Sequence, residues 1–190
     1  MLYEQIEVNK THGKLFKAAT ALVPADKAVP FPDFDADTLS GRKKVSVALD
    51  LRGQVAVVGV SFKHFGYAML PAWLGALKRQ HPQAVTANLN LAEGLVISFL
   101  RPLLVMDMKR NVAPEQHSST YVLFGDAEDI RTDLDIMNRL TGHIFLLDKE
   151  GKIRWRGCGI ATPEELDSML ACYEQLVEPP GNKRLPHGAA

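Results

Sequence analysis

The chain contains two cysteines, Cys158 and Cys172, and any thiol chemistry would have to use them. Thiol–disulfide exchange needs a thiolate at a helix N-terminus, where the helix dipole and the backbone amides lower its pKa, and a second cysteine one turn further on. The turn that leads from the apolar stretch 55–62 into the next helix precedes one such helix N-terminus. It reads "FKHFGYAM", and its one sulfur is the Met69 thioether, which cannot exchange disulfides. We therefore predict no catalytic residues. A thiol oxidoreductase that uses Cys158 stays as the alternative.

Cys158 is expected at the end of a β-hairpin and Cys172 on the last helix, in the same layer, so the two thiols could approach each other. Two small, partly buried residues are the simpler interpretation, and a regulatory disulfide is the other. Two cysteines are too few for a disulfide-stapled secreted domain, which favours a reducing compartment.

Neither a metal nor a cofactor is predicted. The histidines stand at positions 12, 64, 81, 117, 143 and 187, and no two of them have metal-ligand spacing. The stretch "GCGIAT" (157–162) lies between a strand and a helix, as a phosphate-binding loop would. It lacks the third glycine of the dinucleotide fingerprint and the lysine of a P-loop. Its glycines are expected to serve a tight turn and a helix start.

Candidate partner-binding residues lie in "KIRWRG". Lys152, Arg154 and Arg156 share one face of a predicted strand, and Ile153 and Trp155 share the other. This pattern fits either a solvated basic face over a core tryptophan or a cationic surface for a partner at an exposed sheet edge. Arginines beside an aromatic ring are favoured anchors at protein interfaces. We predict that Arg154, Trp155 and Arg156 bind a protein partner.

Two apolar segments are further candidates. Phe65 and Tyr67 stand in the thiol-free turn, where they could hold an apolar partner or simply fill an empty groove. Both residues are predicted partner contacts. Leu95–Met108 is apolar and carries methionines, so core packing is the first expectation and an adaptable binding face is the second.

The composition bounds the class of protein. The chain has 190 residues, 46% hydrophobic and 23% charged, which suits one globular domain. Twenty-two basic and 22 acidic residues cancel, and this argues against a dedicated nucleic-acid-binding protein. The longest apolar run, Leu95–Met108, is interrupted and shorter than the roughly 20 residues of a membrane span, so we expect no transmembrane segment. The first residues show neither a signal-peptide core nor a typical organelle presequence.

Strands and helices are predicted to alternate. Strands are expected over 45–51, 55–62, 84–91 and 120–126, with a β-hairpin over 143–157. Helices are expected over 3–23, 69–80, 95–109, 127–142 and 163–177. The last of these helices begins with Thr162 as its N-cap and Pro163 at its first position, and Thr162 and Glu165 form a capping box. This order predicts an α/β fold with a mainly parallel central sheet, helices on both faces and a closing hairpin plus helix.

Three parts of the chain are expected. Residues 1–29 are an N-terminal extension that could be helical, residues 30–177 form the α/β domain, and residues 178–190 are a disordered tail.

Two stretches resemble known families. "FPDFDADTLSGRKKVSVALDLRGQVAVVGVSF" and "FLLDKEGKIRW" are similar to the opening and the closing hairpin of peroxiredoxin and thiol-reductase domains, which implies a thioredoxin-like fold. "LTGHIFLLDKEGKIRWRGCGIATPEELDSML" and "VTANLNLAEGLVISFLRPLL" resemble the ATP-ten family of mitochondrial ATP synthase assembly factors. The resemblance extends over Phe31–Leu176, and its last third is the specific part.

The resemblance implies a non-catalytic assembly chaperone for the membrane sector of mitochondrial ATP synthase. The partner would be newly made proton-channel subunit a, bound on the matrix side of the inner membrane with peripheral membrane association. A scaffold without its thiols would keep a groove and an exposed strand edge for an extended or apolar segment. A structural subunit of a large mitochondrial complex is a further alternative.

Overall fold

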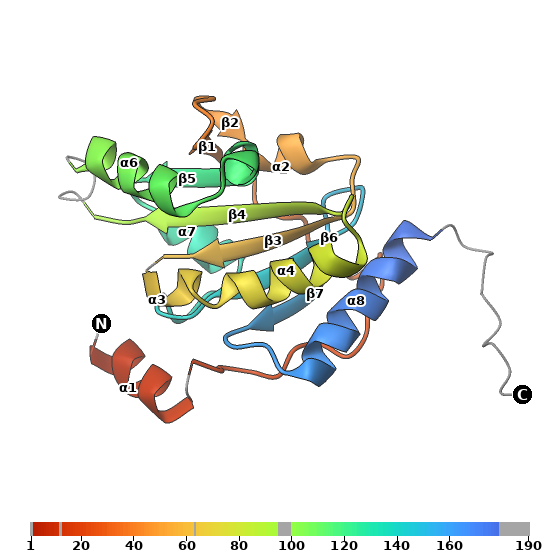
Figure 1. The fold of residues 1–190 in the computed structure, drawn as a ribbon. Helices are drawn as coiled ribbons and strands as arrows, with labels where there is room; N and C mark the ends of the chain where they lie inside the picture. The colour runs from red at the N-terminus through yellow and green to blue at the C-terminus, as the bar shows by residue number, and fades with distance from the viewer. Residues whose placement is uncertain (1, 12, 63, 95–99, 179–190) are drawn as a thin grey trace, which may run out of the picture.

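The computed structural model describes residues 2–11, 13–62, 64–94 and 100–178. These residues form a seven-stranded sheet in the order β2-β1-β5-β4-β3-β6-β7, with helices on both faces (Figure 1). The strands are β1 (Asp35–Thr38), β2 (Val45–Ser46), β3 (Ala56–Ser61), β4 (Val85–Ala92), β5 (Thr120–Phe124), β6 (His143–Leu147) and β7 (Ile153–Cys158). The helices are α1 (Leu2–Thr11), α2 (Val47–Leu51), α3 (His64–Tyr67), α4 (Leu70–Gln80), α6 (Arg101–Asn111), the 3-10 helix η1 (Pro114–Ser119), α7 (Glu128–Asp133) and α8 (Pro163–Val177).

The parallel part of the sheet is its centre. Strand β4 pairs in parallel with β3 and with β5, whereas the other strand pairs are antiparallel. The β6–β7 hairpin turns at Gly151, whose φ of +78° suits a residue without a side chain. The predicted α/β architecture with a parallel centre and a closing hairpin is confirmed.

Strand β3 lies inside the sheet, between β4 and β6, and both of its faces are covered. All six of its residues are buried. Val58 and Val60 join the core under α2 and α7, and Val57 joins the core under α4 and α8. Its one glycine, Gly59, lies against Leu70, where an added Cβ would come within 3.1 Å. A continuous apolar run is what a strand buried on both faces requires.

Helix α8 begins as predicted. The Thr162 hydroxyl accepts a hydrogen bond from Glu165 N, and the Glu165 carboxylate accepts one from Thr162 N at 3.0 Å. Such a box satisfies two backbone donors that a helix start leaves unpaired.

The strand predicted over 45–51 is wrong beyond Ser46. The Ser46 hydroxyl accepts a hydrogen bond from Leu49 N at 3.2 Å and caps helix α2, which begins at Val47. A local side-chain cap therefore prevails over the β-branched pattern.

The helix predicted over 127–142 is also too long, because α7 ends at Asp133. Asp135 has a φ of +52°, and Ile136 N donates back to Arg131 O at 2.8 Å. This pairing is a Schellman-type helix end with an aspartate in the left-handed position. Met137, which lies within the predicted range but beyond the end of α7, is 81% exposed.

The helix predicted over 3–23 stops at Thr11. We call residues 13–31 the N-terminal strap, since they run extended beside β7. Backbone hydrogen bonds join the strap to the hairpin: Ala19 N to Arg156 O, Val23 N to Arg154 O, Ile153 N to Val29 O, and Phe31 N to Gly151 O. The exposed strand edge expected at β7 is therefore wrong. The division at residues 29 and 30 stays a prediction, and the tail from 179 lies outside the described residues.

Candidate functional site

The place of a thiol pair is occupied by a close backbone crossing. Helix α3 fills the turn after β3, and an added Cβ on Gly66 would lie 2.9 Å from the Thr141 carbonyl. An added Cβ on Gly142 would lie 2.5 Å from Gly66 O, so two glycines allow the contact. The sulfur here is the Met69 thioether, 3.5 Å from Gly142 N. This position offers no thiol among the described residues.

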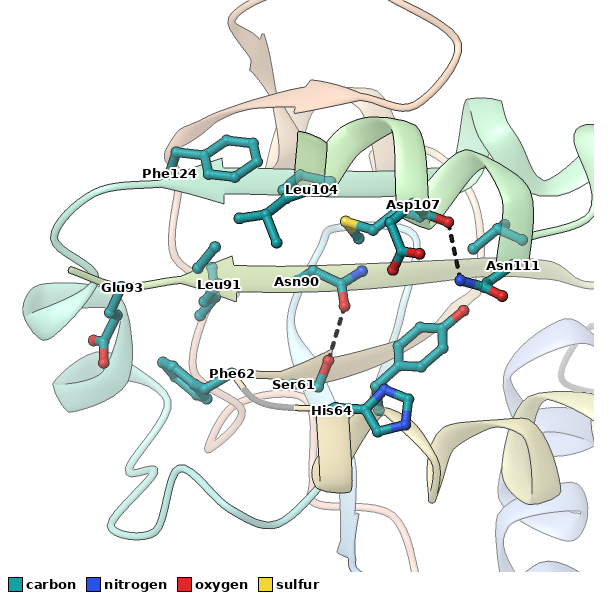
Figure 2. A pocket seen from close by; sticks show the side chains of 15 residues that line it. Ser61, Phe62, His64, Asn90, Leu91, Glu93, Leu104, Asp107, Asn111 and Phe124 are labelled. Carbon is teal, nitrogen blue, oxygen red and sulfur yellow. Dashed lines mark hydrogen bonds between the residues drawn. The ribbon is translucent and has the colours of Figure 1, made fainter. Parts of the chain in front are cut away.

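Beside this crossing lies a cavity of about 390 Å³. It opens where the carboxyl ends of β3, β4 and β5 meet helices α3 and α6 (Figure 2). Side chains of Leu104, Met108, Val122 and Phe124 give it an apolar lining. A mostly apolar cavity of roughly 300–1,000 Å³ with a few polar groups is the usual form of a ligand pocket.

The polar groups of this cavity come from β4 and α6. The Asn90 side-chain oxygen accepts a hydrogen bond from the Ser61 hydroxyl at 3.1 Å. Asn90 Nδ2 is buried and has no hydrogen-bond partner among the described residues. Asp107 and Asn111 project from α6 towards the same space (Figure 2). An amide donor without a partner inside an apolar cavity is a feature that needs an explanation.

Helix α6 covers the cavity without forming part of a closed core, since none of its residues is fully buried. Its inner side, with Val105 and Met108, packs against a small cluster on β5. Its outer side exposes Leu103 and Met106, which are 60% and 46% accessible. The expectation of core packing for 95–108 is thus confirmed for Val105 and Met108 and wrong for Leu103 and Met106, and residues 95–99 lie outside the described part of the chain.

The two aromatic residues of the thiol-free turn take different places. Phe65 is 51% exposed on α3. Tyr67 is half-buried, lines the cavity and packs against both neighbouring clusters, and this burial raises the pKa of its phenol. Tyr67 therefore fills part of the groove, whereas Phe65 remains available for contact.

The residues predicted at the basic strand lie mostly inside the protein. Trp155 is fully buried, donates to Ala19 O at 2.5 Å and packs edge-to-face on Trp73. The Arg154 guanidinium donates to Val23 O at 2.7 Å and pairs with Asp148 at 3.1 Å.

Arg156 bonds Leu134 O at 2.8 Å and stands over the Phe145 ring. The prediction that Trp155 contacts a partner is wrong, because the strap and α4 enclose it. Arg154 and Arg156 bind the protein's own chain.

The alternative that depends on Cys158 receives no geometric support. Both cysteines are free and buried. Desolvation raises the pKa of each thiol, which disfavours the reactive thiolate. Cys158 Sγ exchanges weak hydrogen bonds with the backbone of Phe16 in the strap, so the strap covers it.

Sequence reasoning missed Asn90, Asp107 and Asn111. A signal for Asn90 was present, because an asparagine interrupts the apolar run of the inner strand 84–91. Nothing in the sequence indicated that α6 would bring Asp107 and Asn111 opposite that asparagine.

Solved structures define the class of protein. A thiol:disulfide interchange protein from a Bacteroides species covers 84% of this chain and 95% of its own, with a TM-score of 0.52 and 18% identity. BsSco, a member of the Sco family of cytochrome c oxidase assembly proteins, covers 79% and 94%, with a TM-score of 0.55 and 14% identity. The thioredoxin domain of a thiol-disulfide oxidoreductase from Bacteroides vulgatus covers 80% and 97%, with a TM-score of 0.51 and 15% identity. These likenesses show the thioredoxin-like fold.

The family follows from the sequence comparisons. The family model described as ATP10 protein matches residues 1–176, so the chain belongs to the ATP10 protein family. A relative from Candida glabrata is 28% identical over 92% of this chain and 67% of its own length. One from Saccharomyces cerevisiae is 27% identical over 92% and 69%. Both are called mitochondrial ATPase complex subunit ATP10.

Two findings bound the site further. In the described residues, no helix has the length and apolar character that a membrane crossing needs. The same residues contain no group of three or more histidine, cysteine, aspartate or glutamate side chains that could hold a metal ion.

Proposed function

We propose that this protein is a non-catalytic assembly chaperone for the membrane sector of mitochondrial ATP synthase. The match of residues 1–176 to the ATP10 family carries the proposal, and the relatives are named as mitochondrial ATPase complex subunits. The thiol-free turn supports a binding role over a catalytic one. The client is newly made subunit a, and the protein acts at the matrix side of the inner membrane through peripheral association.

The client is held at the surface of α3 and α6. Phe65 exposes its side chain on α3, Leu103 and Met106 expose theirs on the outer side of α6, and Tyr67 lines the cavity between the helices. Exposed aromatic and methionine side chains suit an apolar segment that must be bound and later released. Arg154 and Arg156 support this surface indirectly, because they fix the strap and the loop after α7.

The test is capture of mitochondrial translation products. Products are pulse-labelled in mitochondria that contain the tagged protein, crosslinked, and recovered with it. Labelled subunit a is expected to be enriched over the other products. Recovery of none of them would contradict the proposal.

A matched pair of variants tests the surface. In Phe65→Ser/Leu103→Ser, recovery of subunit a is expected to fall about tenfold or more, as for loss of interface anchors. Leu49→Ser is the control, because Leu49 is 59% exposed on α2 over the opposite face of the sheet. If both variants recover equal amounts of subunit a, the client does not bind at this surface.

The oxidoreductase alternative has its own assay. Insulin reduction by the full chain is expected to stay at the level of a Cys158→Ala variant. Turnover that the variant abolishes would overthrow the chaperone proposal.

A further inference from the structure

The cavity under α6 combines apolar walls with one buried amide donor that has no partner among the described residues, and its described lining contains neither lysine nor arginine. Asn90 Nδ2 is the unpaired donor, and its oxygen is already bound by Ser61. Figure 2 shows the amide between α6 and the end of β3, with its nitrogen turned away from Ser61. An occupant that accepts one hydrogen bond would remove this deficit.

The charges of the lining disfavour an anionic occupant. Asp107 contributes a carboxylate, and the described lining includes neither lysine nor arginine. Glu93 also lines the cavity, but its carboxylate is already paired with Arg139 at 3.2 Å. A fatty acid or an anionic lipid headgroup would bring a second negative charge into this space, where like charges repel. A neutral group therefore fits better.

The surroundings of the cavity favour a polypeptide over a small free molecule. Helices α3 and α6 both contribute to its lining, and elsewhere on their surfaces they carry the exposed side chains of Phe65 and Met106. Exposed apolar side chains on the helices that line the cavity suit a chain that extends past one anchored residue.

We propose that the cavity is an anchor pocket for one bulky apolar side chain of an uncharged protein segment, and that Asn90 Nδ2 donates a hydrogen bond to a backbone carbonyl of that segment. The inference rests on the proposed function and names the chemistry by which the client is recognised. Leu104, Met108 and Phe124 surround the side chain, and Asn90 fixes its position.

One experiment measures the pocket without the client. N-acetyl-phenylalaninamide, a neutral probe with an apolar side chain and two carbonyls, is titrated into the isotope-labelled full chain. The side-chain amide signal of Asn90 and the methyl signal of Met108 are expected to shift saturably. N-acetylglycinamide, which keeps the carbonyls, and hexanoate, which is apolar and anionic, are expected to leave both signals unchanged.

A second experiment uses the client. Leu104→Trp places an indole in the cavity, and Lys109→Trp places the same ring on an exposed position of the same helix. Leu104→Trp is expected to abolish the probe-induced shifts and to lower recovery of labelled subunit a about thirtyfold, the loss typical of one buried anchor. Lys109→Trp is expected to change neither. Circular dichroism verifies that both variants are folded.

The outcomes separate the two proposals. If wild-type protein recovers subunit a but neither Leu104→Trp nor the probe has an effect, the pocket inference is overturned and the chaperone proposal stands. If wild-type protein recovers no client, the chaperone proposal fails and the titration alone decides the pocket. A saturable shift then upholds its ligand chemistry, and its absence overturns it.

Discussion

The β7 edge and the α6 groove are both places where a thioredoxin-like scaffold could bind a segment, but only one of them is open. At β7 the strap already bonds the backbone of the hairpin, and Trp155 and Arg154 donate to strap carbonyls. At α6 the helix exposes Leu103 and Met106, and below it the Asn90 amide nitrogen has no hydrogen-bond partner within the described part of the chain.

The difference shows how the same fold handles an edge and a groove. An unpaired strand edge attracts other chains, so covering it with a segment of the same chain protects the monomer. A buried donor without a hydrogen-bond partner lowers the stability of the free protein. Such a donor is retained where a binding partner accepts its hydrogen bond. Side chains at the edge should therefore affect stability, and side chains at the groove should affect binding.

The largest expected effect is Trp155→Ala. The substitution removes a fully buried ring and leaves Ala19 O without its donor, so unfolding free energy should fall by about 4 kcal/mol. Phe65→Ala, at the groove, should cost about 0.5 kcal/mol or less. Urea unfolding of both variants measures the two losses of unfolding free energy. Similar losses would contradict the expected difference between the β7 edge and the α6 groove.

Arg154→Ala comes next. It leaves the Asp148 carboxylate, only 6% exposed, without its cation and should cost about 3 kcal/mol. Lys152→Ala is the matched control on the same strand face. The Lys152 ammonium bonds Ala25 O in an exposed position, and its loss should cost about 0.5 kcal/mol. If Arg154→Ala lowers the unfolding free energy no more than Lys152→Ala does, the contacts of Arg154 do not hold the strap on β7.

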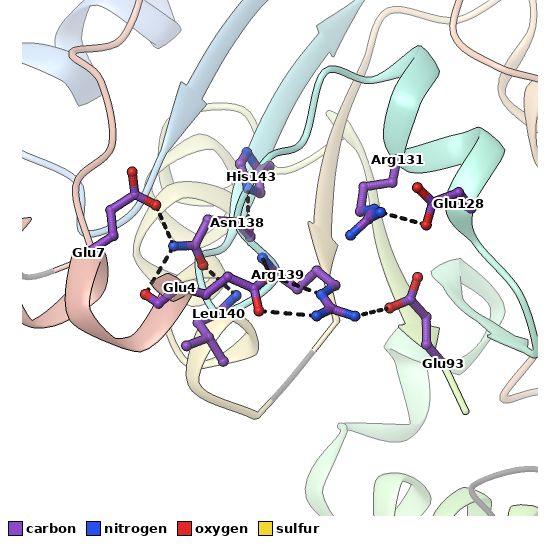
Figure 3. Close-up of polar contacts among 9 residues, drawn as sticks. All are labelled: Glu4, Glu7, Glu93, Glu128, Arg131, Asn138, Arg139, Leu140 and His143. Atoms are coloured by element: carbon purple, nitrogen blue, oxygen red, sulfur yellow. Dashed lines mark hydrogen bonds and ion pairs between the residues drawn. The ribbon is translucent and has the colours of Figure 1, made fainter. Parts of the chain in front are cut away.

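Helix α1 gives the stability of the protein a pH dependence. Arg139 hydrogen-bonds the Glu4 carboxylate, which lowers the Glu4 pKa from 4.5 to about 2, and it also reaches Glu93 (Figure 3). A lowered folded-state pKa stabilises the protein above the unfolded-state pKa, and this stabilisation is lost as pH falls from about 5 to about 2.

The matching variant is Glu4→Gln. It should be less stable than wild type by about 2 kcal/mol at pH 7, with the gap closing near pH 2. Glu128→Gln, which removes an exposed pair with Arg131, should show almost no gap. Urea unfolding across this pH range measures the unfolding free energy of both variants and of wild type. A difference between Glu4→Gln and wild type that does not change with pH would refute the proposed role of the Glu4 carboxylate.

The smallest expected effect is a gain. Ser61→Ala/Asn90→Leu replaces the hydrogen-bonded pair and its unmet donor with apolar groups. The melting temperature should rise by about 3 °C, equivalent to about 1 kcal/mol, while recovery of subunit a falls. Ser61→Ala alone should lower the melting temperature, because it leaves the Asn90 oxygen without its donor. A double variant that is less stable than wild type would show that Asn90 is a structural residue.

Signals that lie within a few residues predicted the fold well. The apolar run of β3, the hairpin with Gly151 and the capping box at Thr162 all appear in the structure where they were expected. Two local predictions failed because a competing local signal was stronger: Ser46 caps a helix inside an apparent strand, and Asp135 ends α7 early. For the candidate site, the sequence indicated Tyr67, which lines the cavity, and the partner contacts of Phe65 and Tyr67 stay a prediction. Trp155 was expected at a partner surface but is buried.

By itself, the sequence determined the α/β architecture, the absence of a thiol pair at the turn after β3, and the family. Only the tertiary structure decided that the strap closes the β7 edge, because Arg154 and Val23 are 131 positions apart and no periodicity links them. The α6 cavity has the same origin. Its amide, its apolar walls and its carboxylates come from separate elements, and packing alone brings them together.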